Sequence, residues 1–248
     1  MKSTNDLTTQ KFWEKYWSSK NLLQKVQKDH EFANIFRQYL TGKNYNTMLE
    51  IGGFPGYYAI YFAKYWNYTS TLLDFVVNNQ LLIKLLKIND LTHKQVKVIK
   101  RDFFKHNVTE KYDLVFSKGF IEHFEDTEDV ISRHWQYVSK GGTMIINLPN
   151  FTGFNGIYQL IHDPANLNAH NLTSMDMDRL NKAIKNLEPK KYSVFYGGGV
   201  LVWLERLNTK SWLTRFTTNF LGLLGLALSK LGIRGRFVSP HIFIIAEK

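Results

Sequence analysis

The central part of the chain alternates between short apolar runs and longer stretches in which apolar residues recur at helical spacing. The runs have the length of strands and lie at about 47–51, 69–74, 96–99, 112–117 and 143–149. Amphipathic segments follow three of these runs, at about 56–66, 76–88 and 126–138. The alternation predicts an α/β architecture over residues 46–148, with a mostly parallel sheet and helices on both faces.

The region before this core predicts two helices over residues 9–40. The first has aromatic residues at helical spacing, namely Phe12, Trp13, Tyr16 and Trp17. The second pattern runs through the apolar residues from Leu22 to Leu40, and Thr41-Gly42 marks its end.

The region after the core begins with an insertion over 150–190 that is rich in Asn and His. A helical pattern occupies about 175–187, and we expect the insertion to lie over the strand ends as a lid. Further strands are expected at about 192–205, where a Gly197–Gly199 triplet interrupts the pattern, and at 238–246.

Residues 212–231 form an unusual segment because its centre, 220–228, is apolar on every side. Cations surround it, namely Lys210, Arg215, Lys230, Arg234 and Arg236. The unbroken run is shorter than the roughly 20 residues that span a bilayer. Three interpretations stay open: a helix in a membrane interface, the wall of an apolar substrate pocket, or a buried core or homodimer helix.

Length and composition narrow the class of protein. A chain of 248 residues suits a single domain with insertions, spanning 1–248. The net charge of +11 favours nucleic acid, anionic lipid or a phosphorylated substrate, unless it reflects a general excess of Lys. The absence of cysteine excludes disulfides and thiolate chemistry. Residues 1–6 lack the apolar core of a signal peptide, so we expect a cytoplasmic protein. This expectation is compatible with peripheral contact at the inner membrane surface.

The first strand leads into a glycine-rich turn, Gly52-Gly53-Phe54-Pro55-Gly56, and then into a helix. Such a corner binds nucleotides because glycines let the backbone approach a ligand and the helix N-terminus offers free N–H groups. The spacing matches neither the dinucleotide fingerprint nor the phosphate loop. Glu50, just before the turn, disfavours a phosphate and suits a ligand with ammonium or hydroxyl donors.

Asp74 ends the second strand, about 20 positions after the turn. Ligands of open α/β sheets lie at the carboxyl ends of the strands, where a carboxylate in this place grips ribose hydroxyls. The alternative is that Asp74 caps the next helix.

The sequence Glu50-x-Gly52-x-x-x-Gly56 resembles the first motif of class I S-adenosylmethionine-dependent methyltransferases, with Phe54 in place of the usual middle glycine. Three later features also resemble the family. They are Asp102-Phe103 after the third strand, Ser117 with Glu122-His123 after the fourth, and the Gly141-Gly142 turn before the fifth. The Glu122-His123 pair is typical of the small-molecule branch related to quinone-biosynthesis methyltransferases.

The resemblance implies a Rossmann-like, seven-stranded methyltransferase sheet. Its parts would be an N-terminal helical cap (1–42), a cofactor-binding core (46–148) and substrate-side insertions (150–190 and 206–236). It also implies S-adenosylmethionine as the cofactor, with contacts from Glu50, Gly52, Gly53, Gly56, Asp74, Asp102, Phe103 and Ser117. In the family the residue in the place of Asp102 accepts from the adenine amine, and the residue in the place of Phe103 covers the ring.

The implied function is methyl transfer to a small-molecule acceptor, with a sugar or a lipid-linked intermediate as candidates. Catalysis would rest chiefly on holding the methyl group in line with the acceptor. His123 is the candidate general base, against a structural role in its loop. Trp13, Tyr16 and Trp17 of the cap would either touch the ligand or pack on the domain.

Other possibilities complete the predictions. His162 and His170 of the insertion either act on substrate or are solvated, and no set of His, Asp and Glu has the sequence spacing of a metal site. An RNA methyltransferase is the alternative favoured by charge, although the Asn/Asp-Pro-Pro-aromatic motif of base N-methylation is absent. A second alternative is a non-catalytic, membrane-associated binding module.

Overall fold

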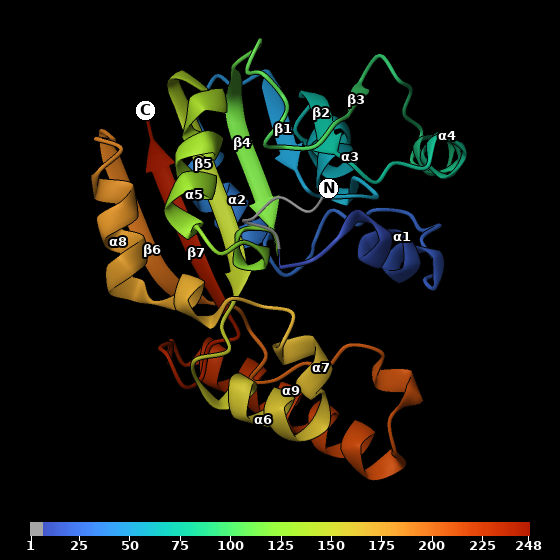
Figure 1. Cartoon of the computed structure of the whole chain (residues 1–248), viewed down its shortest axis with the longest axis vertical. Helices are drawn as coiled ribbons and strands as arrows, with labels where there is room; N and C mark the ends of the chain where they lie inside the picture. Colours follow the sequence, from blue (N-terminus) through green and yellow to red (C-terminus); the bar gives the residue numbers. More distant parts are fainter. Residues whose placement is uncertain (1–6) are drawn as a thin grey trace.

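A computed structural model describes residues 7–248; residues 1–6, with the expectation that they form no signal peptide, lie outside the described part. Seven strands form one sheet in the order β3-β2-β1-β4-β5-β7-β6 (Figure 1). They are β1 (Thr47–Ile51), β2 (Thr69–Asp74), β3 (Val96–Lys100), β4 (Tyr112–Lys118), β5 (Val138–Pro149), β6 (Lys191–Gly197) and β7 (His241–Glu247). β7 runs antiparallel to both of its neighbours, β5 and β6, and the β1 to β5 pairings are parallel. The seven-stranded α/β sheet implied by the motifs is confirmed.

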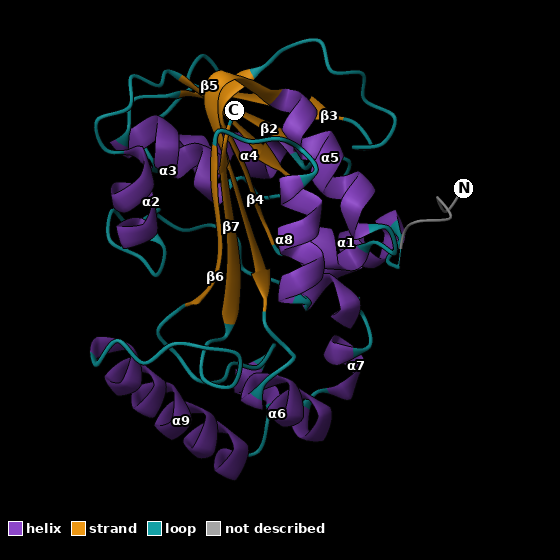
Figure 2. Cartoon of the chain, turned by 90° about the vertical axis from the view of Figure 1, so that its left-hand side faces the viewer, coloured by secondary structure: helices purple, strands orange, loops and turns teal. Residues whose placement is uncertain are grey.

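Helices cover both faces of the sheet, as the alternating pattern predicted (Figure 2). One face packs on α2 (Ala33–Leu40), α3 (Tyr57–Tyr65) and α4 (Asn79–Ile88), through side chains such as Met48, Phe116 and Phe243. The other face packs on α5 (Thr127–Tyr137) and α8 (Met177–Lys185), through Val115, Ile146 and Ile244. Odd and even positions of each strand thus supply two separate cores.

The N-terminal region forms α1 (Gln10–Ser18) and α2, but the chain between them is not helical. The prediction of a helical segment beginning near Leu22 is wrong. Leu22 is buried beside Phe54 instead, and its carbonyl accepts a hydrogen bond from the Tyr57 hydroxyl (2.8 Å). The Val26 N–H donates to the Asn89 side chain (2.8 Å). These tertiary partners satisfy the backbone without a helix.

β6 ends at Gly197, so the prediction of a strand continuing to residue 205 is also wrong. Gly198 has a φ of 100°, and a Cβ there would lie 2.8 Å from Pro240. Beyond this turn the chain leaves the sheet and approaches α9 so closely that a Cβ on Gly225 would lie 2.1 Å from the Leu201 nitrogen.

The insertions lie beyond the carboxyl ends of the parallel strands (Figure 1). They contain α6 (Phe154–His162), α7 (Pro164–Leu167), the 3-10 turns η2 (Leu172–Met175) and η3 (Leu207–Thr209), and α9 (Trp212–Lys230). A further 3-10 turn, η1 (Ile121–His123), follows β4. α6 and α9 meet where the Tyr158 hydroxyl bonds those of Thr217 (2.9 Å) and Thr218 (3.0 Å).

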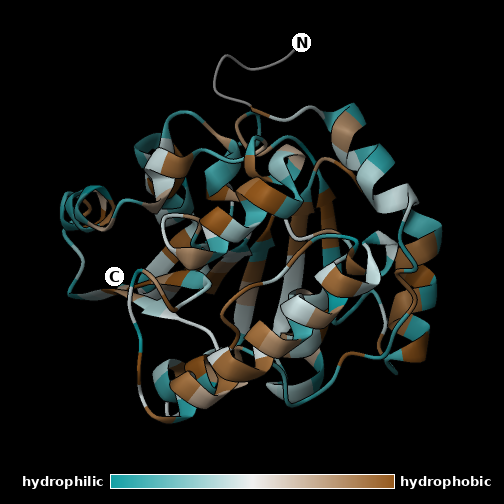
Figure 3. Ribbon diagram, turned by 90° about the horizontal axis from the view of Figure 1, so that it is seen from below, coloured by the Kyte–Doolittle hydropathy of each residue, from teal (hydrophilic) through white to brown (hydrophobic). Residues whose placement is uncertain are grey.

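The helix expected over 212–231 exists as α9, but it is not a buried core helix. Thr218 and Gly225 are its buried residues, and large apolar side chains of α9 face solvent. Figure 3 shows brown apolar stretches along both α6 and α9 at this end of the molecule. Among residues 7–248, no helix is both long and apolar enough to cross a bilayer.

Candidate active site

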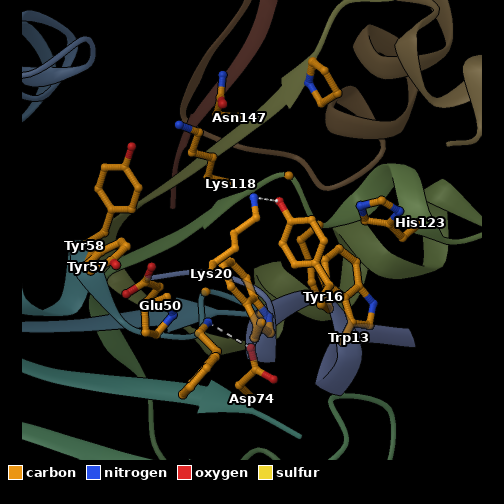
Figure 4. A pocket seen from close by; sticks show the side chains of 18 of the residues that line it. Trp13, Tyr16, Lys20, Glu50, Tyr57, Tyr58, Asp74, Lys118, His123 and Asn147 are labelled. Atoms are coloured by element: carbon orange, nitrogen blue, oxygen red, sulfur yellow. Dashed lines mark hydrogen bonds between the residues drawn. The ribbon is translucent and has the colours of Figure 1, made fainter. Parts of the chain in front are cut away.

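A cavity of about 720 Å³ lies at the carboxyl ends of the parallel strands, beneath α1 and beside the insertions (Figure 4). Its lining includes residues at or just after the ends of β1, β2, β4 and β5, namely Gly52, Asp74, Lys118 and Pro149. β1 and β4 are neighbours in the sheet, and the strand order runs in opposite directions from them. Open α/β sheets bind ligands at such a topological switch point. The volume is that of a site for small molecules.

The glycine-rich turn forms one wall, and its backbone is packed too tightly for side chains. Gly52 has a φ of 63°, and a Cβ there would lie 1.9 Å from the Phe120 ring. A Cβ on Gly53 would lie 2.1 Å from Glu50 Oε1. Glu50 is buried beneath the turn, and its Oε2 accepts a hydrogen bond from the Ala59 N–H of α3 (2.7 Å). Burial raises the pKa of Glu50 to about 8. The turn therefore presents bare backbone to the cavity, as close approach of a cofactor requires.

Asp74 lies at the end of β2 and lines the same cavity. Its Oδ2 accepts from the Phe54 N–H (3.0 Å), and its Oδ1 accepts from the Val76 N–H (2.8 Å). Burial raises its pKa to about 6. The N-cap of α4 is Asn78, so Asp74 does not cap that helix. It joins the glycine turn to the end of β2.

Asp102 and Phe103 also line the cavity. Asp102 accepts from the Phe104 N–H (2.9 Å) and pairs with Lys105 (3.2 Å). The Phe103 ring is buried and meets Phe120 edge to face, with ring centroids 5.4 Å apart. A carboxylate and an aromatic ring therefore stand side by side at the edge where the resemblance places an adenine.

Gly56 and Ser117 are two of the expected cofactor contacts that are not among the lining residues. Gly56, with a φ of 92°, is the N-cap of α3. The Ser117 side chain is buried in the core, where its hydroxyl bonds Nε2 of His134 (3.1 Å). His134 Nδ1 lies 2.7 Å from the Val130 carbonyl and donates to it, so Nε2 accepts from Ser117.

His123 lines the cavity, but its ring is held on several sides. Nδ1 donates to the Ala169 carbonyl (2.9 Å), and the ring packs against Trp13 (centroids 4.9 Å apart) and His170 (4.7 Å). Burial, with a contribution from His170, lowers the pKa of His123 to about 3. The imidazole is therefore neutral at physiological pH, and one of its nitrogens is already occupied.

The cap supplies aromatic side chains to the cavity, from Trp13, Tyr16 and Trp17 of α1. Across the cavity, Lys20 pairs with Glu205 (2.8 Å), and the Tyr16 hydroxyl donates to the same carboxylate (3.1 Å). Lys20 also donates to the Tyr16 hydroxyl (Figure 4). We name this group of three residues the cap latch. Sequence analysis missed it because its members lie at opposite ends of the chain.

A second charged group, also missed from the sequence, borders the cavity near β4 and β7. Glu31 pairs with Lys118 and lies 3.7 Å from His241 Nε2. Although burial opposes this, His241 and Lys118 lower the pKa of Glu31 to about 2. The group places Lys118 of β4 and His241 of β7 on either side of one carboxylate, which balances the charge of the lysine.

The insertion brings His170 to the cavity wall, whereas His162 is not among the lining residues. Glu122, His123 and His170 form a cluster in which one potential ligand atom from each lies within 4.8 Å of the others. Because His170 comes from a distant part of the chain, sequence spacing gave no indication of this set.

Part of the chain matches a family model in sequence, and the fold matches solved structures. Residues 49–146 match a family model described as "Methyltransferase domain". Phosphoethanolamine N-methyltransferase 2 of Haemonchus contortus, solved with S-adenosyl-L-methionine, superposes with a TM-score of 0.59 and 16% identity over 87% of this chain and 51% of its own. An S-adenosylmethionine-dependent methyltransferase from Archaeoglobus fulgidus superposes with a TM-score of 0.54 and 18% identity, over 87% of this chain and 92% of its own. The plantazolicin methyltransferase BpumL was solved with a desmethylplantazolicin analogue and S-adenosylhomocysteine. It superposes with a TM-score of 0.55 and 11% identity, over 88% of this chain and 81% of its own. No curated protein matches the sequence.

Residues 49–146 thus match a methyltransferase domain, and the sheet with its flanking helices has the fold of these solved methyltransferases, as the motifs implied. The domain match covers the glycine turn, Asp74, Asp102 and the end of β4. The chain spans about half the length of the phosphoethanolamine methyltransferases that it resembles.

Proposed function

We propose that this enzyme transfers the methyl group of S-adenosylmethionine to a small-molecule acceptor bound in the same cavity. The observation that carries the proposal is that a single cavity is lined by the cofactor motifs and by the cap and insertions. Gly52, Gly53 and Asp74 border one part of it, and Lys20, Trp203 and Glu205 border another. The cap latch closes over it, which suits an acceptor that is small or presents a narrow end.

The cofactor, when bound, supplies an activated methyl group and its own leaving group. The chain's part is to orient and to exclude water. Asp74 holds the turn through the Phe54 N–H, and Glu50 holds the start of α3 through the Ala59 N–H. We assign Asp102 and Phe103 to the adenine. Since burial lowers the pKa of His123 to about 3, its free Nε2 is a weak base, and we assign His123 a positioning role in place of the general-base role expected from the sequence.

Calorimetric titration of S-adenosylmethionine and S-adenosylhomocysteine into wild type and Asp74→Asn tests this assignment. Loss of charge-assisted hydrogen bonds to ribose removes about 1.5–3 kcal/mol, so binding should weaken by roughly 10- to 150-fold. Asp178→Ala, an exposed carboxylate on α8, is the matched control and should bind as wild type does. Absence of cofactor binding by folded wild type would refute the proposed function; unchanged binding by Asp74→Asn would refute the ribose contact alone.

We also propose that α6 and α9 dock on an anionic membrane surface, which would suit a lipid-linked acceptor. Large apolar side chains of these helices are exposed, among them Ile157, Leu160, Ile161, Trp212, Phe216, Phe220 and Leu223. The apolar surface continues through Leu231 and Phe237. A patch of this kind on a protein surface marks an interaction site.

Charge favours a lipid surface as the partner. Residues 206–240 contain six cations and no Asp or Glu, and residues 149–161 carry no charged side chain. Apolar helices bordered by cations bind at the headgroup level of anionic bilayers. None of the residues of α9 lines the cavity, so the pocket-wall interpretation is not supported.

Vesicle flotation with phosphatidylcholine alone, and with added phosphatidylglycerol, tests the docking surface. Wild type should float with the anionic vesicles, less so at high salt, and Leu223→Glu should reduce the bound fraction severalfold or more. Ile83→Glu, which charges another exposed apolar position, on α4, should leave the bound fraction unchanged. No flotation of wild type, or a solution dimer that Leu223→Glu dissociates, would refute membrane docking.

A further inference from the structure

Three side chains with metal-ligating atoms converge at one wall of the cavity. Glu122 and His123 belong to η1 after β4, and His170 lies in the insertion just before η2. Their potential ligand atoms lie within 4.8 Å of one another. Two backbone links hold the segments together: the Asn171 N–H donates to the Glu122 carbonyl (2.7 Å), and the Asn171 side chain donates to the Phe124 carbonyl (2.9 Å). The cluster is therefore built by the fold.

Glu122 is fully buried, yet neither of its carboxyl oxygens has a hydrogen-bond partner among the described residues. Buried polar groups in native proteins are nearly always paired, so an unpaired carboxyl calls for a partner that the chain does not supply. No lysine or arginine nitrogen pairs with it in the part of the chain that the structure describes.

Both histidines are oriented in the manner of metal ligands. Nδ1 of His123 donates to the Ala169 carbonyl (2.9 Å), and Nδ1 of His170 donates to the Asn166 carbonyl (2.6 Å). In each ring this fixes the proton on Nδ1 and leaves a free lone pair on Nε2. Metal-bound histidines show the same outer hydrogen bond, which fixes the tautomer and the ring orientation.

The surroundings supply the remaining features of such a site. The Trp13 ring packs against His123 at 4.9 Å, and the Phe151 ring packs against His170 at 5.0 Å. An apolar shell of this kind limits water and competing ligands. A network of direct hydrogen bonds does not account for the cluster, because the Glu122 carboxyl makes none with the described residues.

We infer that Glu122, His123 and His170 bind a divalent transition metal ion, with Zn²⁺ as the best match. Two imidazole nitrogens and one carboxylate oxygen are a ligand set that Zn²⁺ uses when a fourth position stays open. Zinc–ligand bonds of about 2.0–2.2 Å place ligand atoms roughly 3.3 Å apart, so small side-chain rotations would complete the site. All three residues line the cavity, so the fourth position would be accessible to an acceptor.

Direct metal titration tests the site without any methyl transfer. Tag-free protein is stripped with EDTA, desalted and titrated with ZnCl₂ by calorimetry, and with CoCl₂ by visible absorption. Wild type should bind one ion per chain and show the absorption of a low-coordinate Co²⁺ ion. Glu122→Gln and His170→Ala should each weaken Zn²⁺ binding at least about tenfold. His162→Ala, a histidine of the same insertion outside the cluster, should bind as wild type does.

The outcomes separate cleanly. A wild type that binds neither ion overturns the inference, as does binding that survives in both Glu122→Gln and His170→Ala. Because Glu122→Gln replaces an unpaired carboxyl by a neutral side chain of the same shape, it should fold, and thermal unfolding checks this. S-adenosylmethionine binding is measured separately on the same samples, so a failure of the metal site is distinguished from a failure of the proposed methyl transfer.

Discussion

At the scale of single residues, Glu50 shows how the cofactor turn is supported. Its carboxyl is buried between the turn and α3, with one oxygen bound to the Ala59 N–H. Burial raises its pKa to about 8. The folded protein therefore holds a proton at Glu50 over a pH range in which the unfolded chain has released it.

The free energy of unfolding should consequently fall as the pH rises from about 5 toward 8, where the folded state must give up this proton. For one group, the fall is up to about 1.4 kcal/mol per pH unit. Glu50→Gln removes this contribution and should flatten the dependence. Asp74, whose pKa is raised to about 6, keeps a smaller slope of the same sign at lower pH. Urea unfolding at pH 5, 6, 7 and 8 measures this pH dependence of the free energy of unfolding. Glu188→Gln, at an exposed site, should retain the wild-type slope; an equal slope in Glu50→Gln would contradict the argument.

Some residues of the site could be placed from the sequence because strand ends are predictable. Apolar runs locate the ends of β2 and β3, and Asp74 and Asp102 follow from them. Ser117 could not be placed, since the direction of its side chain depends on packing against His134 of α5. The Phe54 backbone, which the motif alone leaves uncertain, is fixed by its hydrogen bond to Asp74.

At the scale of elements, α1 is joined to the far side of the cavity by the cap latch. The Lys20–Glu205 ion pair is partly buried, with side chains 29% and 28% exposed. Partly exposed pairs contribute about 0.5–1 kcal/mol, so the latch stabilises the closed cap modestly and permits opening.

Glu205→Gln should therefore speed the dissociation of S-adenosylhomocysteine by roughly two- to fivefold, as measured by stopped-flow fluorescence of the cap tryptophans. Glu247→Gln is the matched control, because the Lys43–Glu247 pair has a similar length (2.9 Å) and exposure but lies away from the cavity. Equal dissociation rates in the two variants would show that the latch does not hold the cap.

Elements with a regular period were predictable, and those fixed by tertiary contacts were not. The strands and helices of the core agree with their apolar patterns. Residues 19–32 and 198–206 have apolar side chains at suitable spacing, yet both segments are irregular. The first is held by the Tyr57 side chain of α3 and by Asn89, which follows α4, and the second by its close approach to α9.

At the scale of the whole molecule, the chemistry and the exposed apolar surface occupy different parts of the fold. The cavity lies between the sheet and the cap, and α6 and α9 extend beyond it (Figure 1). The net charge of +11 is the sole feature favouring RNA, and that alternative stays a prediction. Neither the cap latch nor the Glu122–His123–His170 cluster could be predicted, because each joins distant segments that no local pattern relates.

Under the proposed function, the aromatic wall of the cavity has a consequence for the end of each catalytic cycle. Rings of Trp13, Tyr16, Trp17, Tyr57 and Tyr58 line it. The quadrupole of such rings attracts a positive charge more than a neutral group. Since the methyl donor is a sulfonium cation and its demethylated product is neutral, the wall distinguishes fresh cofactor from spent cofactor by charge alone. The transfer itself thus weakens the enzyme's hold on what it must release.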